Sequence, residues 1–175
     1  MDFAVNYLAP FLLTNLLLPL LKASAPSRIV NVSSSLHLEG KINFDDLQSE
    51  HNFDTYSTYS QSKLALLLFT KKLARLLAGT GVTANALHPG VVATRMSTDN
   101  IAHMNPLIRL AYSATFLSPE KGAETSVYLA TSPEVAGISG KYFAKKKPAP
   151  VLPLADDKTL ADRLWDVSEN LVGLQ

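Results

Sequence analysis

Two short runs of apolar and β-branched residues constrain the fold of this chain most strongly. Residues 28–33 are short, β-branched and continuous rather than alternating, which is typical of a strand buried on both faces of a parallel sheet, and residues 82–87 are a second run of strand-forming residues. A helix-like stretch precedes the first run, and another separates it from the second. The sequence therefore predicts an α/β fold in which helices alternate with the strands of a parallel sheet.

The remaining elements follow from periodicity and from Gly and Pro punctuation. Helices are predicted at about residues 3–22, 56–77, 119–131 and 156–171, and a third strand at 140–143. The first helix is apolar around most of its circumference, so we expect it to be buried on most faces. Pro10 and Pro19 interrupt it, and a membrane span needs about 20 apolar residues, so we expect no transmembrane segment. With about three strands, the first strand is expected at an exposed sheet edge.

Composition limits the classes of partner. The chain has 175 residues, of which 47% are apolar and 18% charged, and a formal net charge of +1; this fits one globular domain with no bulk attraction to nucleic acid. The absence of cysteine excludes disulfides and is compatible with a cytoplasmic location. His37, His51, His88 and His103 lack metal-ligand spacing, so we expect no metal site.

Tyr59 and Lys63 are the first candidates for chemistry. They are four residues apart in a predicted helix and therefore share one of its faces. A phenol with a pKa near ~10 is a poor acid or base at neutral pH, but an ammonium group within about 4–6 Å lowers that pKa. The plain alternative is an exposed tyrosine above a lysine, so the pair needs further support to indicate an acid–base site.

Polar groups and a proline-glycine turn follow the two predicted strands. Ser33, Ser34 and Ser35 end the first strand, and residues 89–94 (Pro-Gly-Val-Val-Ala-Thr) leave the second. The carboxyl ends of parallel strands form the edge at which open α/β sheets bind ligands, and a serine there can donate to a developing alkoxide. The alternatives are a strand-to-loop cap and an ordinary turn. Asn6, in the apolar first helix, needs partners for its amide; its alternative role is that of a core asparagine.

In this order and spacing, the features resemble the short-chain dehydrogenase/reductase family. Its N-x-S-S strand end, Y-x-x-x-K helix and P-G-x-x-x-T loop correspond to residues 31–34, 59–63 and 89–94. Residues 5–15 and 163–168 are similar to the retinol dehydrogenase-like branch. The resemblance implies the C-terminal part of a Rossmann-type doubly wound parallel sheet.

The resemblance also implies a role for each matching residue. Tyr59 would exchange a proton with the substrate oxygen and also contact the cofactor. Lys63 would lower the Tyr59 pKa and hold the nicotinamide ribose, and Ser34 would polarise the carbonyl. The two neighbouring serines remain alternatives to Ser34. Asn6 would position a water in a proton relay through Lys63. The nicotinamide ring and carboxamide would be lined by Pro89, Gly90, Val92 and Thr94.

The implied cofactor is NADP or NAD, with NADP slightly favoured, and its binding site is incomplete in this sequence. In the family, that site begins with a glycine-rich turn after the first strand. None of the eight glycines forms such a cluster near the N-terminus. We therefore expect residues 1–175 to be a single partial domain, the catalytic half, whose N-terminal strands are missing because an internal methionine was taken as the start or because the gene is truncated.

Two functions remain open at this point. The first is an oxidoreductase that interconverts an alcohol and a carbonyl by hydride transfer with NAD(P), on a hydrophobic or retinol-like small molecule. The second is a non-catalytic truncated remnant or interaction module, unable to bind dinucleotide, that pairs through its exposed sheet edge. The resemblance further implies a homodimer through the first two helices.

Overall fold

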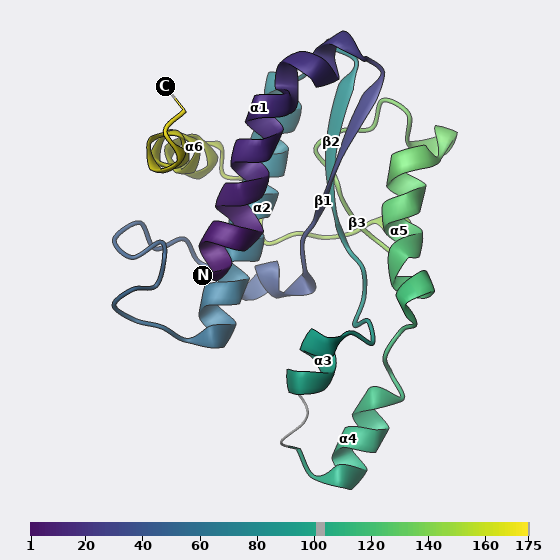
Figure 1. Cartoon of the computed structure of the whole chain (residues 1–175). Coiled ribbons are helices and arrows are strands. Elements are labelled where there is room, and N and C mark those ends of the chain that lie inside the picture. The colour runs from purple at the N-terminus through teal and green to yellow at the C-terminus, as the bar shows by residue number, and fades with distance from the viewer. Residues whose placement is uncertain (101–103, 175) are drawn as a thin grey trace.

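The computed structural model describes residues 1–100 and 104–174 of the chain (Figure 1). Its α-helices are α1 (Ala9–Ala23), α2 (Thr55–Leu76), α3 (Arg95–Asn100), α4 (Pro106–Ser113), α5 (Pro119–Thr131) and α6 (Lys158–Val172). Its strands are β1 (Ser27–Val32), β2 (Val82–His88), β3 (Tyr142–Ala144) and β4 (Lys147–Pro148). A π-helical turn, η1 (Ala4–Leu8), leads into α1, and 3₁₀ turns are found at η2 (Ser35–Glu39), η3 (Pro133–Val135) and η4 (Pro153–Asp156).

The strands form one sheet in the order β1-β2-β3-β4. β1 pairs with β2 in parallel over its whole length, and β2 pairs with β3 in parallel. The predicted α/β fold with a parallel sheet, part of a Rossmann-type fold, is confirmed. The two-residue β4, antiparallel to β3, was not predicted, because a run of three lysines before a proline carries no strand pattern.

Helices cover both faces of the sheet, with α1 and α2 on one side of β1 and β2 and α5 on the other (Figure 1). Ala84 and Ala86 of β2 are fully buried in the core that includes α2, and their small side chains let the helix approach the sheet closely. On the opposite face, Leu87 packs with Leu129 of α5 and Phe143 of β3. This arrangement fixes α2 above the ends of β1 and β2.

β1 lies at the end of the sheet order, so the predicted exposed edge is confirmed for the described part of the chain. The prediction that this strand is buried on both faces is wrong in part. Ile29 and Asn31 are buried, whereas Val30 is half-buried and Val32 is 46% exposed. A strand with a neighbour on one side only receives less cover than an interior strand, and its apolar composition does not reveal this.

The first helix packs through one aromatic face. Phe3, Tyr7 and Phe11 are buried in the core, whereas Leu16 and Leu20 are 62% and 63% exposed. The prediction of burial on most faces is therefore wrong, since a helix that is apolar all round does not show in its sequence which face is packed. By length and hydropathy, Ala4–Ala23 could also cross a membrane. Core helices meet the same criterion, so the absence of a transmembrane segment stays a prediction.

Candidate functional site

A cavity of about 400 Å³ opens at the carboxyl ends of β1 and β2, beside the first turns of α2. It is lined by Val32, Ser33, Ser34, Tyr59, Lys63, His88, Pro89, Gly90, Val92, Thr94, Ser97, Pro119 and Gly122. All the predicted site residues except Asn6 therefore border one cavity. Its volume lies within the range of roughly 300–1,000 Å³ that is typical of small-molecule sites.

Ser34 and Tyr59 both line the cavity, and hydrogen bonding from the Ser34 side chain lowers the pKa of the Tyr59 phenol. Ser34 is buried and caps η2, where its Oγ accepts a hydrogen bond of 3.2 Å from the Leu36 amide. Because that contact uses an acceptor lone pair, the hydroxyl proton of Ser34 remains available for donation. Ser33 faces elsewhere, since its Oγ donates to the Lys63 carbonyl at 3.0 Å. Ser35 is exposed, so the geometry favours Ser34 among the three serines.

Lys63 lies on the same face of α2 as Tyr59, as the spacing predicts. Its ammonium is 5.3 Å from the centroid of the Tyr59 ring and donates a hydrogen bond of 3.1 Å to the carbonyl of Val32. The cation therefore sits over the ring while anchored to the end of β1. A strand-end hydroxyl, a phenol and an ammonium group thus meet at one cavity.

The pKa of Tyr59 is shifted in the direction opposite to the prediction. Burial raises the pKa above its ordinary value of 10.0, the hydrogen bond with Ser34 lowers it, and the Asp2 carboxylate raises it. Burial also lowers the pKa of Lys63, whereas Asp2 raises it. The predicted lowering of the Tyr59 pKa is thus wrong for this structure, because desolvation of the phenolate dominates. Tyr59 is accordingly a protonated phenol at neutral pH.

We expect Ser34→Ala to raise the pKa of Tyr59 further, because the substitution removes a hydrogen bond that favours the phenolate. The measurement is an ultraviolet pH titration of the phenolate, with the trace of Tyr59→Phe subtracted so that one tyrosine is followed. Ser57→Ala is the matched control, since Ser57 is an exposed serine in the first turn of α2. A Tyr59 pKa that is equal in Ser34→Ala and the unmodified chain would contradict the hydrogen bond.

The two asparagines of the predicted pattern hold α2 in place. Asn6, in the π-helical turn η1, donates from Nδ2 to Ser62 Oγ at 3.2 Å, and Ser62 donates to the Tyr59 carbonyl at 2.7 Å. Asn31 of β1 is buried and donates to Thr70 Oγ1 at 2.9 Å. Asn6 therefore lies behind the cavity, where it touches the helical turn that carries Tyr59.

The loop after β2 is held against the segment that precedes α5. Val92 and Leu117 form a parallel bridge. Gly90 has a φ of +90°, and a Cβ there would lie 2.5 Å from Leu117, so the turn requires glycine. A Cβ on Gly122 would lie 2.4 Å from the Val92 side chain. Thr94 Oγ1 lies 3.1 Å from Ser97 Oγ. The loop and α5 therefore form one wall of the cavity.

Sequence reasoning missed five residues that line this cavity: Val32, His88, Ser97, Pro119 and Gly122. His88 directly precedes the proline-glycine turn and Val32 directly precedes the predicted serines, so their positions were usable signals. Ser97 contacts Val92 and Thr94 of the same loop. Pro119 and Gly122 border the cavity because the loop packs on α5, a contact that no local pattern reveals. Among residues 1–100 and 104–174, no three His, Asp or Glu side chains form a group that could hold a metal ion.

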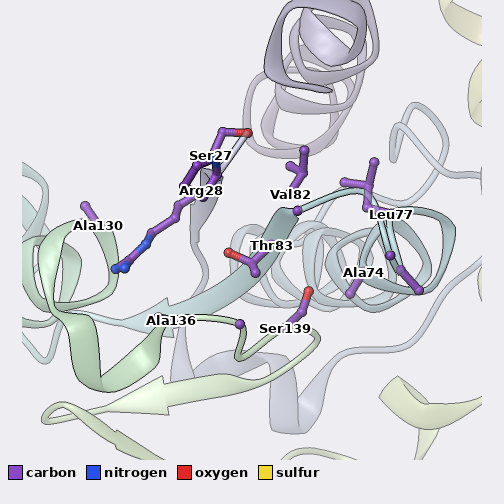
Figure 2. Close-up of a pocket in the computed structure, with 14 residues that line it drawn as sticks. Ser27, Arg28, Ala74, Leu77, Val82, Thr83, Ala130, Ala136 and Ser139 are labelled. Atoms are coloured by element: carbon purple, nitrogen blue, oxygen red, sulfur yellow. The ribbon is translucent and has the colours of Figure 1, made fainter. Parts of the chain in front are cut away.

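A second cavity of about 660 Å³ lies at the opposite ends of β1 and β2 (Figure 2). Its lining includes Arg28 and Thr83, but none of the predicted site residues. Arg28 reaches towards α5 (Figure 2) and donates to the carbonyls of Leu129 and Ser132 at 3.0 and 2.8 Å. This arginine connects the start of β1 to the end of α5. The residues that line the larger cavity do not include the acid–base groups of the smaller one.

Comparison of the sequence with known proteins identifies its relatives. Residues 2–105 match the family described as short chain dehydrogenase. Human retinol dehydrogenase 14 is 54% identical over 176 residues, which cover 99% of this chain and 52% of the relative. Human retinol dehydrogenase 13 is 49% identical over 180 residues, which cover 100% and 54%. The chain thus spans about half the length of these curated relatives.

Solved structures agree with the sequence comparison. An uncharacterized protein from Mycobacterium paratuberculosis is 32% identical with a TM-score of 0.71, over 97% of this chain and 57% of that one. The Pseudomonas aeruginosa RhlG/NADP active-site complex is 26% identical with a TM-score of 0.62, over 81% and 53%. The sequence, its fold and these relatives lead to one assignment: the chain belongs to the short-chain dehydrogenase/reductase family, in its retinol dehydrogenase-like branch.

Proposed function

We propose that the chain carries the catalytic half of an oxidoreductase that interconverts an alcohol and a carbonyl by hydride transfer with NAD(P). The observation that carries this proposal is that Ser34, Tyr59 and Lys63 line one cavity, with the Lys63 ammonium 5.3 Å from the centroid of the Tyr59 ring. Relatives named retinol dehydrogenases support a hydrophobic, retinol-like substrate. The relative solved as a complex with NADP supports NADP as the cofactor.

The residues of the cavity fit the nicotinamide end of such a cofactor. Gly90 has a φ of +90° and carries no side chain, and Pro89, Val92 and Thr94 line the same wall. In the proposal, these residues hold the nicotinamide ring and carboxamide, and Lys63 donates to the ribose hydroxyls. When bound, the nicotinamide supplies or accepts the hydride.

The protein groups handle the proton and the developing charge on the substrate oxygen. In the direction of reduction, Ser34 donates a hydrogen bond to the carbonyl oxygen and polarises it. Tyr59, which is protonated at neutral pH, gives its proton to the oxygen as the carbonyl becomes an alcohol. Asn6, fixed by Ser62 one residue before Lys63, would position the water that passes a proton to Lys63 and restores the phenol.

A remnant or interaction module is the second candidate, and the free edge of β1 favours it. Within the described residues, β1 has a strand neighbour on one side only, and such an edge can pair with a strand of another chain. Exposed Leu13, Leu16 and Leu20 on α1 also support the proposed homodimer through α1 and α2. A chain that supplies only part of the dinucleotide site is expected to bind the cofactor weakly.

Titration with NADPH, followed by its fluorescence, tests the proposal, and turnover of a retinoid aldehyde completes the test. We expect saturable binding, and we expect Lys63→Met to weaken it by about 10–100-fold, the effect of removing a hydrogen bond from a charged group. Lys22→Met is the matched control, because Lys22 lies in the last turn of α1 and does not line the cavity. A folded chain without saturable binding would favour the remnant over the oxidoreductase.

A further inference from the structure

Two histidines hold opposite sides of the peptide group that joins Ser34 to Ser35. The Nδ1 atom of His37 lies 2.6 Å from the carbonyl oxygen of Ser34. The amide of Ser35 donates to Nδ1 of His88 across 3.4 Å. The carbonyl and the amide belong to the same peptide unit, so one ring contacts each of its polar atoms. Neither histidine had a role in the sequence-based prediction.

These contacts define the proton positions on both rings. A carbonyl only accepts, so Nδ1 of His37 carries its proton, and a backbone amide only donates, so Nδ1 of His88 is bare. Nε2 of His37 is buried, and no described residue offers it a hydrogen bond, which fits a neutral ring with its single proton on Nδ1. A neutral His88 then carries its proton on Nε2.

The surroundings keep both rings neutral. His37 is fully buried and packs against the ring of Tyr142, with 4.7 Å between centroids, and Lys71 of α2 is the cation that acts on it. His88 is half-buried at the wall of the cavity. Burial lowers the pKa of both histidines. The charge of Lys71 lowers the pKa of His37 further, and a charge on His37 would lower the pKa of His88.

We propose that His37 and His88 are positioning residues for Ser34, because together they fix the peptide unit that follows it and so aim its hydroxyl at Tyr59. This inference rests on the proposed function, in which Ser34 polarises the substrate carbonyl. This peptide unit begins the turn in which the Ser34 Oγ accepts a hydrogen bond from the Leu36 amide. If the unit rotates, the Leu36 amide moves and the hydrogen bond that orients the Ser34 hydroxyl is lost.

The arrangement makes His88 the acid-sensitive member. A proton added to Nδ1 of His88 would face the Ser35 amide, two donors would meet, and the contact would be lost. A proton added to His37 goes to Nε2 and leaves its Nδ1 donor in place, with burial and Lys71 opposing it. Because its folded pKa is lowered, the contribution of His88 is complete above the unfolded pKa of about 6.5 and is lost as pH falls through the folded value.

The test uses the Tyr59 pKa, which the Ser34 hydroxyl lowers, and therefore needs no catalytic activity. In the phenolate titration, His88→Leu is expected to raise that pKa, as Ser34→Ala does, whereas His88→Asn keeps an acceptor at the δ position and stays closer to the unmodified chain. His37→Asn, which keeps a donor there, is compared with His37→Leu. If Ser34→Ala raises the pKa but His88→Leu leaves it unchanged, the proposal is overturned.

Two further readouts separate this proposal from the function on which it rests. Nitrogen NMR at neutral pH should find the proton on Nδ1 of His37 and on Nε2 of His88; a proton on Nδ1 of neutral His88 would overturn the proposal even if the chain is inactive. If the chain is active, His88→Leu should lower kcat about tenfold, the effect of one ordinary hydrogen bond, and change KM less. Protonation of His88 should lower kcat at low pH, and this loss should be absent in His88→Asn, which has no imidazole to protonate. Absent turnover would count against the oxidoreductase, while the titration and the NMR would still decide the role of the histidines.

Discussion

Tyr59→Phe is expected to lower kcat for carbonyl reduction by about 10²–10⁴-fold, the contribution of a well-placed general acid. The phenol lines the cavity together with Ser34 and is protonated at neutral pH. Phenylalanine retains the ring but has no proton to give to the substrate oxygen. NADPH affinity should change little, because the ring and the other walls of the cavity remain.

Tyr56→Phe is the matched control for this experiment. Tyr56 lies one helical turn before Tyr59, is 48% exposed and does not line the cavity. The position four residues after it is Ser60, so no cation follows at the spacing of Lys63. We expect Tyr56→Phe to keep kcat within about twofold of the unmodified chain. The role of Tyr59 would be refuted if its variant kept more than about a tenth of kcat.

The sequence predicts elements well where local chemistry sets their limits. α5 begins at Pro119 as predicted, because Ser118 caps it by accepting from the Lys121 amide and proline fits the first helical position. β1 and β2 follow from their short runs of strand-forming residues. The face shared by Tyr59 and Lys63 follows from helical spacing alone. For these features, residues near in the chain supply the decisive interactions.

Features that depend on distant residues were predicted poorly. The exposed leucine face of α1 depends on which neighbours cover the helix. The direction of the Tyr59 pKa shift depends on its burial, on the Ser34 side chain and on the Asp2 carboxylate. The pairing of His37 and His88 around one peptide unit arises when β1 and β2 align. The named site residues other than Asn6 line one cavity, but its electrostatics required the packed structure.

Phe11→Ala is expected to lower the free energy of unfolding by about 3–5 kcal/mol, the usual loss for a fully buried aromatic ring. Phe11 is 0% exposed, and its ring centroid lies 5.2 Å from that of Phe69 and 4.9 Å from that of Trp165. It therefore joins α1, α2 and α6, and its removal leaves a cavity where the three helices meet. Chemical denaturation, followed by the fluorescence of the single tryptophan, measures the loss.

Leu16→Ala is the matched control, because it shortens a side chain in the same helix on the face that points away from the core. Leu16 is 62% exposed, so its truncation should change the free energy of unfolding by no more than about 0.5 kcal/mol. The denaturant dependence should be the same in both variants, since each unfolds to a similar chain. Equal losses for the two would mean that the outer face of α1 is covered in solution, which is the result that a homodimer through this helix would give.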